Sequence, residues 1–477
     1  MNLQLSSIEL MYQIASNQLT EEQLQKYRYQ NLLELKNLAV QLQDGKKLYP
    51  AMRQRLFQKI AHHLAGLKRK IVVGIMNDDS SSWIGDELYW LLERSDIFTP
   101  YVFALRDHTR EAEDQELQIA YEALIQDLQK RGLRTVENYD AQHQREYTWQ
   151  ELPVHPDICI WMTPWMYLFA GDLRVWNFPL TTLHTYIPYG YFVASNADHT
   201  FPYDQYNQEL HNLAWLIFQE DAFSLQMAEK YCFSGNGNCR YTGYPKMDAY
   251  YAANTEEPSL WEPLLKANGT PQAKKIIYSP HHSFTAQDIV TLSTFAQNGQ
   301  LMLELAKKYQ KETVWVFKPH PQLGIKAIRY GIFKDQAEWE AYLSSWEALP
   351  NATVQTTGEY HRLFQESDAI LNDSASFMAE YLFVNKPMLE LRRPEQQFNE
   401  FGQMILQFLY QADGGDAAAI ERFLQEVVLG GKDVKRQERE AFFAKYLDYG
   451  HETHHTAAEN IFGTLYAQLC VDGGVNA

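Results

Sequence analysis

The sequence predicts an α/β protein with two parallel-sheet domains of the Rossmann-like kind, and three observations support this fold class. Apolar runs without alternation, such as Ile71–Met76 (IVVGIM), are typical of strands that helices cover on both faces. Helical stretches separate these runs, which is the order expected of parallel strands joined by crossover helices. The chain has 477 residues, which exceeds what one hydrophobic core usually organises, so we expect two domains.

Residues 1–70 are expected to form an N-terminal helical extension. Thr20 and Gln23 have the spacing of a capping box at a helix start. From Met52 to Leu67, apolar residues recur at helical spacing. Basic residues gather over residues 46–70, and this face is either simply solvated or contacts an anionic lipid surface or a polyanionic acceptor. These residues are Lys46, Lys47, Arg53, Arg55, Lys59, Lys68, Arg69 and Lys70.

The first Rossmann-like domain is expected over residues 71–255. Its helices are expected at Gly85–Glu93 and Asp114–Arg131. After Ile71–Met76, apolar runs predict further strands at Tyr101–Leu105, Ile158–Met162 and Leu183–Ile187.

A proline- and glycine-containing stretch, residues 256–273, is expected to link the two domains. The second Rossmann-like domain, which would bind the donor, is expected over residues 274–430, and C-terminal helices over residues 431–477. Its strands are expected at Lys274–Tyr278, Val314–Lys318, from Val354 onward, at Ala369–Leu371 and at Pro387–Leu391. Its helices are expected at Leu292–Tyr309, Ala337–Ala348, Tyr360–Glu366 and Phe377–Val384.

Two polar turns in this second domain predict a phosphate site. The turn Asn372–Ser376 lies between a buried strand and a helix start, where unpaired N–H groups and the helix dipole favour anions. The Lys-Pro-His-Pro turn Lys318–Pro321 follows another strand. Because carboxyl ends of parallel strands share one edge of a sheet, we expect the two turns to hold a nucleotide-linked donor.

Composition narrows the classes of partner. The net charge of −18 and the isoelectric point near 5.3 argue against nucleic-acid binding, which needs a basic face. The four cysteines lack a metal-binding spacing. Because the cysteines are few and the start lacks a secretion-signal pattern, we expect the protein in the reducing cytoplasm. No apolar run approaches the roughly 20 residues that span a bilayer. No Asp-x-Asp pattern, which would indicate a metal-bound sugar nucleotide, stands out in the sequence. We therefore expect no required metal, and we expect no cofactor.

Four segments, taken in order, resemble the CDP-glycerol glycerophosphotransferases, which have the two-domain GT-B glycosyltransferase fold. Thr181–Gly190 (TTLHTYIPYG) is similar to the Trp-His-Gly-Thr-Pro turn of that family. Tyr241–Asp248 (YTGYPKMD) is similar to its Gly-Tyr-Pro-Arg-Asn-Asp element, and Lys318–Pro321 (KPHP) matches its Arg/Lys-Pro-His-Pro. Ser367–Pro387 is similar to its Ser-Asp, Asp-Tyr-Ser-Ser and Lys-Pro series.

The resemblance implies roles for individual residues. His184 falls on the family histidine that acts as general base toward the acceptor hydroxyl, and His320 falls on the histidine that contacts the donor diphosphate. Leu183 and Thr185 replace the Trp and Gly that flank the family base. The resemblance makes His184 and His320 the catalytic candidates and implies that the first domain holds the acceptor. Together with the turn chemistry, it implies donor-phosphate contacts for Lys318, Ser376, Ser374, Asp373 and Ser283. His281 and His282 belong to the same set, and at most one of them is expected to reach phosphate, because adjacent side chains of an extended segment point to opposite sides.

The resemblance also implies an activity. We expect transfer of a glycerol-phosphate unit from CDP-glycerol to a hydroxyl of a cell-surface glycan or polyol-phosphate acceptor, with release of CMP. Such an enzyme would serve teichoic acid or capsule synthesis, in the cytoplasm or on the inner face of the plasma membrane. Two alternatives stay open. One is a GT-B enzyme that uses another donor, such as CDP-ribitol or a nucleotide sugar, and the other is a non-catalytic phosphopolymer-binding protein.

Overall fold

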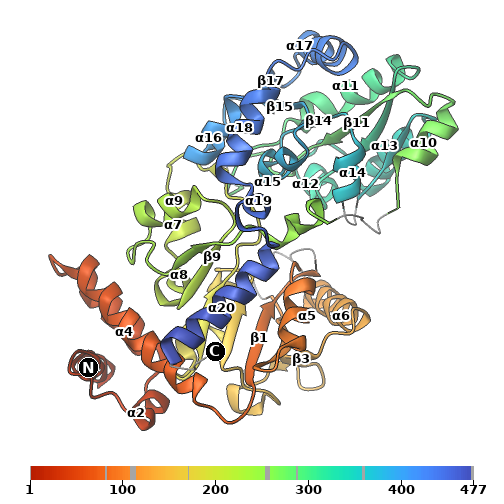
Figure 1. Ribbon diagram of the computed structural model, residues 1–477. Coiled ribbons are helices and arrows are strands. Elements are labelled where there is room, and N and C mark those ends of the chain that lie inside the picture. Colours follow the sequence, from red (N-terminus) through yellow and green to blue (C-terminus); the bar gives the residue numbers. More distant parts are fainter. Residues whose placement is uncertain are drawn as a thin grey trace. The chain divides into compact units, whose positions relative to one another are not determined.

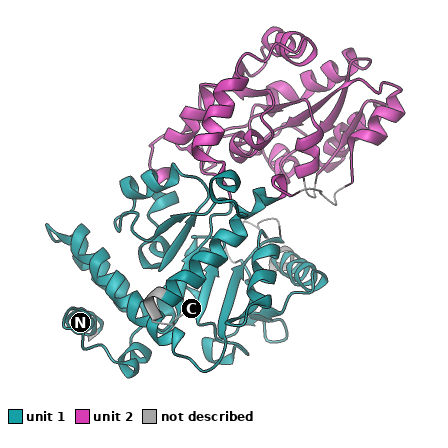
Figure 2. Ribbon diagram, in the orientation of Figure 1, with its two compact units in different colours: residues 1–189, 203–248, 449–477 teal, residues 190–202, 249–448 magenta. Residues whose placement is uncertain are grey.

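The computed structural model describes residues 2–80, 83–107, 114–169, 171–252, 258–285, 288–356 and 360–473. The chain divides into two compact units, which are coloured separately in Figure 2. Unit 1 comprises residues 1–189, 203–248 and 449–477, and unit 2 comprises residues 190–202 and 249–448. Each unit is built around its own parallel sheet.

Unit 1 contains a seven-stranded sheet with the order β10-β9-β7-β6-β1-β2-β3, in which every neighbouring pair is parallel. The central strands are buried along nearly their whole length, which explains their unbroken apolar sequences. The strands are β1 (Ile71–Asn77), β2 (Phe98–Ala104), β3 (Thr135–Glu137), β6 (Ile158–Trp161), β7 (Leu183–Tyr186), β9 (Leu216–Gln219) and β10 (Cys239–Tyr241).

Helices from both ends of the chain pack in unit 1. The last helix, α20 (Ala457–Gly473), lies beside α4 (Gly45–Ala65) and α5 (Asp86–Arg94), as Figure 1 shows. At the start of α2, the predicted capping box is present, because Thr20 and Gln23 exchange backbone-to-side-chain hydrogen bonds. The other helices are α1 (Asn2–Ala15), α2 (Glu21–Lys26), α3 (Tyr29–Val40), α6 (Asp114–Lys130), α8 (Glu209–Leu213), α9 (Ser224–Tyr231) and α19 (Tyr449–Thr453).

Unit 2 contains a six-stranded parallel sheet with the order β13-β12-β11-β14-β15-β17. Its core is aromatic, with Trp315, Phe317 and Trp346 fully buried, and the rings of Phe317 and Trp346 stack at 5.1 Å. The strands are β11 (Lys274–Ser279), β12 (Thr313–Phe317), β13 (Ala352–Val354), β14 (Ala369–Asn372), β15 (Met388–Arg392) and β17 (Tyr410–Asp413).

The helices of unit 2 alternate with these strands along the chain. They are α10 (Trp261–Asn268), α11 (Phe295–Lys308), α12 (Leu323–Arg329), α13 (Gln336–Glu347), α14 (His361–Glu366), α15 (Ala375–Glu380), α16 (Glu400–Leu406), α17 (Ala417–Arg422) and α18 (Arg436–Tyr446). This alternation confirms the predicted fold class, which is α/β with two parallel sheets and helices at both ends of the chain.

The boundaries of some segments differ from those expected from the sequence. The stretch expected as a linker contains α10, whose Trp261 is buried and donates its ring N–H to the Leu363 carbonyl. Residues 449–477 return to unit 1 rather than forming a separate group of helices. In the described part of the chain, no helix is long and apolar enough to cross a membrane, and the four cysteines are free thiols.

Candidate donor-binding site in unit 2

Three loops of unit 2 begin side by side at the carboxyl edge of its sheet. They follow β11, β12 and β14, which are neighbours in the sheet. The register pairs Tyr278 with Phe317 and Ser279 with Asn372, so the three strands end at the same level. The backbone N–H of His320 donates to the Pro280 carbonyl at 3.1 Å, which ties the first two loops together.

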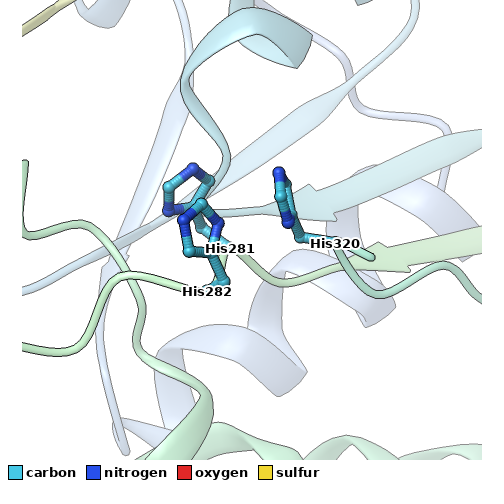
Figure 3. A group of neighbouring side chains, drawn as sticks. All are labelled: His281, His282 and His320. Atoms are coloured by element: carbon cyan, nitrogen blue, oxygen red, sulfur yellow. The ribbon is translucent and has the colours of Figure 1, made fainter. Parts of the chain in front are cut away.

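Three histidines from two of these loops form a compact cluster (Figure 3). The ring centroids of His281 and His282 lie 4.2 Å apart, those of His282 and His320 lie 4.0 Å apart, and those of His281 and His320 lie 5.2 Å apart. All three residues were predicted as donor-site residues. The structure brings their rings together, which sequence spacing alone does not show.

Hydrogen bonds from neighbouring residues orient two of the rings. Nδ1 of His320 accepts the backbone N–H of Gln322 at 3.1 Å. Nδ1 of His281 accepts the backbone N–H of Ser283 at 3.2 Å and lies 2.7 Å from the hydroxyl of the same residue. In a neutral imidazole whose Nδ1 accepts an N–H, the ring proton is on Nε2. Both rings can therefore donate a hydrogen bond from Nε2 to an anion.

The histidines of the cluster are held neutral at physiological pH. Burial, together with the neighbouring His282, His320 and Lys326, lowers the pKa of His281 well below its usual value. Burial and Lys326 lower the pKa of His282 to about 4. Burial, His282 and Lys318 lower the pKa of His320 to about 3. The cluster therefore acts through neutral nitrogen atoms rather than through positive charge.

Positive charge at this edge of the sheet comes from two lysines. Lys318 is 8% exposed, and its ammonium group lies over the ring of Tyr360, 5.4 Å from the ring centroid. Lys326, on α12, forms an ion pair with Asp288 and lies close enough to lower the pKa of His282. The sequence analysis missed Lys326, although its position one helical turn after the Lys-Pro-His-Pro turn was a usable indication.

Asp373 holds two loops in place instead of facing a ligand. Its side chain is fully buried, and Oδ1 accepts the backbone N–H of His281 at 2.5 Å. Oδ2 accepts both the backbone N–H and the hydroxyl of Thr294, each at 2.6 Å. With both oxygens occupied in this way, Asp373 positions the backbone of the histidine cluster.

The three predicted serines differ in their surroundings. Ser283 is 1% exposed, and its hydroxyl lies beside His281 Nδ1 and accepts the N–H of Leu292 at 3.1 Å, so it supports the cluster. Ser374 is the N-cap residue of α15 but makes no side-chain capping hydrogen bond, and it is 8% exposed. Ser376 is the second residue of this helix and is half-buried.

His184 lies in the interior of unit 1. It is the second residue of β7 and is fully buried, and its Nδ1 accepts the ring N–H of Trp161 at 2.9 Å. The rings of Tyr29 and Phe178 pack edge-on against it at 4.5 and 4.8 Å. Burial lowers the pKa of His184 to about 3. These contacts are those of a core histidine, and the predicted role as general base stays a prediction.

The Tyr241–Asp248 motif forms a structural junction within unit 1. Asp248 Oδ1 accepts the Ala457 N–H at 2.7 Å and the Tyr449 hydroxyl at 2.6 Å, and Oδ2 accepts the Ala458 N–H at 3.1 Å. This carboxyl therefore caps the start of α20. Gly243 has a φ of +85°, in the left-handed region, and packs against the ring of Tyr449.

The two α/β units, each built on its own parallel sheet, place the chain in the GT-B-like fold class. The family model of the CDP-glycerol:poly(glycerophosphate) glycerophosphotransferases matches residues 194–452, which is more than half of the chain, and the chain belongs to this family. The matched range includes the second, third and fourth sequence motifs. Thr181–Gly190, which contains His184, lies outside it.

Solved structures with a similar fold share little sequence with this chain. UDP-GlcNAc 2-epimerase from Neisseria meningitidis, bound to UDP-GlcNAc, is 16% identical with a TM-score of 0.53, covering 83% of this chain and 99% of its own. A putative UDP-N-acetylglucosamine 2-epimerase from Listeria monocytogenes is 14% identical with a TM-score of 0.54, covering 83% and 96%. The wall teichoic acid polymerase TagF is 13% identical with a TM-score of 0.49, covering 92% and 98%. No curated protein sequence matches the chain.

Proposed function

We propose that this enzyme transfers glycerol phosphate from CDP-glycerol to a hydroxyl of a cell-surface glycan or polyol-phosphate acceptor, with CMP as the leaving group. The observation that carries the proposal is the family match. Two of the family motifs follow β12 and β14, the strands on either side of β11, so both lie at the same edge of the sheet of unit 2. The product would be a polymer of the teichoic acid or capsule type.

The donor diphosphate is proposed to bind at the edge formed by the loops after β11, β12 and β14. Nε2–H groups of His281 and His320 would donate to phosphate oxygens, and Lys318 would offset their charge. The hydroxyls of Ser374 and Ser376 would add further donors. Hydrogen bonds to a charged group contribute about 1.5–3 kcal/mol each, so a few such contacts suffice for micromolar binding.

In the proposed reaction, the acceptor oxygen attacks the phosphorus atom that carries glycerol. The bond from this phosphorus to the bridging oxygen of the diphosphate breaks, and CMP leaves with that oxygen. The acceptor hydroxyl loses its proton to a base. Phosphoryl transfer of this kind asks the protein mainly for positioning and for stabilisation of charge on the phosphate oxygens.

The role of His184 can be tested apart from its role in packing. If His184 is the base, His184→Ala lowers kcat at least 100-fold while the protein keeps its melting temperature and its affinity for CDP. If the ring serves the core, the melting temperature falls and the remaining folded enzyme keeps its turnover rate. The surroundings of the ring favour the second outcome.

A CMP-release assay tests the proposed function. Purified protein is incubated with a poly(glycerol phosphate) primer and, in separate reactions, with CDP-glycerol, CDP-ribitol or UDP-GlcNAc. We expect CMP from CDP-glycerol and a large loss of rate in Ser376→Ala. His143→Ala, at an exposed position in unit 1, serves as the matched control. Turnover of the UDP-sugar alone would overturn the donor assignment, and no turnover of any donor would favour a binding protein.

Peripheral contact with an anionic membrane is proposed for the N-terminal helices. Of the basic residues over 46–70, Arg53 is buried and donates to the Asn212 carbonyl at 2.8 Å, whereas Lys46, Lys47 and Arg55 are exposed. Large apolar side chains are exposed nearby in the chain, at Leu3, Leu5, Ile8, Met11, Tyr12, Val40, Leu42 and Leu48. Exposed cationic and apolar side chains together suit a lipid surface, which would place the enzyme on the inner face of the plasma membrane.

A further inference from the structure

We propose that His281, His282 and His320 form a binding site for one transition-metal dication of the zinc class. One ligand nitrogen from each ring lies within 4.8 Å of those of the other two, and the three rings lie side by side (Figure 3). Tetrahedral zinc has bonds of about 2.0–2.1 Å to nitrogen, which places its ligands roughly 3.4 Å apart. Binding would require the three nitrogens to move closer together than the 4.8 Å within which they now lie.

A second observation points to a missing ligand at this cluster. Nδ1 of His282 is buried and has no hydrogen-bond partner among the described residues. A buried polar atom without a partner costs free energy, and native structures satisfy nearly all such atoms. A metal ion bound to the cluster would engage the His282 ring.

The ring tautomers permit coordination at a small cost. Coordination through Nε2 requires the ring proton on Nδ1, so with a metal bound the donor phosphate would contact the metal instead of the Nε2–H groups of His281 and His320. At His281, the hydroxyl of Ser283, 2.7 Å away, can accept that proton, which is the usual arrangement behind a metal-bound histidine. At His320, the bond from the Gln322 N–H at 3.1 Å would be lost. One or two neutral hydrogen bonds are weak compared with three metal–nitrogen bonds.

The ligand set selects the metal. Three imidazoles suit zinc, cobalt, nickel or copper, whereas magnesium and calcium require oxygen ligands. Two cations lie near the cluster and oppose a metal ion. Lys326 is paired with Asp288, which weakens its effect, and Lys318 acts on His320. Three protein ligands leave a fourth position open. The assignment of that position to a phosphate oxygen of the donor rests on the proposed function, whereas metal binding itself does not.

Metal content tests the inference directly. Tag-free protein is loaded with zinc, dialysed and measured by elemental mass spectrometry, in the wild type, His282→Ala, His320→Ala and the control His143→Ala. We expect about one zinc per chain in the wild type and in the control, and at least a tenfold loss in the other two. Less than 0.1 zinc per wild-type chain, or full retention in His282→Ala, would overturn the inference.

A spectroscopic measurement on the wild type removes any dependence on the folding of the variants. Cobalt(II) added to metal-free wild-type protein is expected to give intense visible absorption from a four-coordinate site, saturating at one equivalent. A weak six-coordinate spectrum without saturation would contradict the inference. CMP release by a protein that binds neither zinc nor cobalt would overturn the metal site and leave the proposed function intact. Stoichiometric metal binding without turnover of any CDP-linked donor would support the metal site and overturn the proposed function.

Discussion

Replacing Gly243 by alanine should disrupt the junction that attaches the C-terminal helices to unit 1. A Cβ atom at this position would lie 2.2 Å from Cγ and 2.3 Å from Cδ1 of Tyr449, far inside van der Waals contact. Tyr449 is fully buried and cannot move freely, because its hydroxyl donates to Asp248 at 2.6 Å. The φ of +85° adds backbone strain for any residue with a Cβ.

The expected cost follows from these two effects. A left-handed backbone costs a non-glycine residue about 1–2 kcal/mol, and overpacking of a core adds about 1–3 kcal/mol. We therefore expect Gly243→Ala to destabilise unit 1 by about 2–5 kcal/mol, a large share of a typical stability of about 5–15 kcal/mol.

Hydrogen exchange is the suitable assay, because a protein with two units need not unfold in one step. In Gly243→Ala, amides of α20 should exchange faster, and the melting temperature of unit 1 should fall. Gly237→Ala is the matched control, since an added Cβ meets no atom within 4 Å there and the φ is not positive. If Gly243→Ala changed α20 exchange no more than Gly237→Ala, the steric reasoning would be refuted.

Three further predictions concern charge. Burial and the neighbouring Asp221 raise the pKa of Glu220 well above its usual value of 4.5. Glu220 therefore loses its proton at a lower pH in the unfolded chain than in the folded protein. As a result, the free energy of unfolding falls as pH rises above about 4.5, by at most about 1.4 kcal/mol per pH unit. When the free energy of unfolding is measured in urea between pH 5 and 8, its fall with rising pH should be smaller in Glu220→Gln than in the wild type. An equal fall in both proteins would contradict this. Lys318→Ala should lower kcat/KM for CMP release about 10- to 100-fold, and wild-type kinetics would exclude a donor contact. Replacing Lys46 and Lys47 by glutamate should weaken sedimentation with anionic vesicles but not with neutral ones, and equal binding to both vesicle types would argue against an electrostatic contact.

The sequence analysis found the strands that are long, apolar and buried. The runs at Ile71–Met76 and Lys274–Tyr278 became β1 and β11, because a strand covered on both faces needs continuous apolar residues. The strands β3 and β10 have only three residues each and lie at the sheet edges. Such strands are only partly buried, so they need no apolar run that the sequence could reveal. The return of α20 to unit 1 has no local signature, because it depends on packing between distant segments.

The predicted site residues also differ in what the local sequence indicates and what depends on packing between distant segments. The turns after β12 and β14 were expected at one sheet edge because parallel strands share that edge, and the register agrees. The separate roles of Asp373 and Ser283, which support the backbone and the ring of His281, depend on side-chain directions that spacing does not encode. His184 has polar chemistry but lies within a strand buried at every residue, and a strand interior offers little access to a substrate.

The return of residues 449–477 to unit 1 affects how the protein can be made. The chain passes between the units after residues 189, 202, 248 and 448, so no uninterrupted fragment contains all of unit 1. During synthesis, unit 2 can be completed before α20 has been made. Until then, the apolar surface of α4 and α5 that α20 covers stays exposed. An expression fragment that stops near residue 448 would therefore leave unit 1 prone to aggregation, whereas residues 249–448 could be produced separately with much of their fold intact.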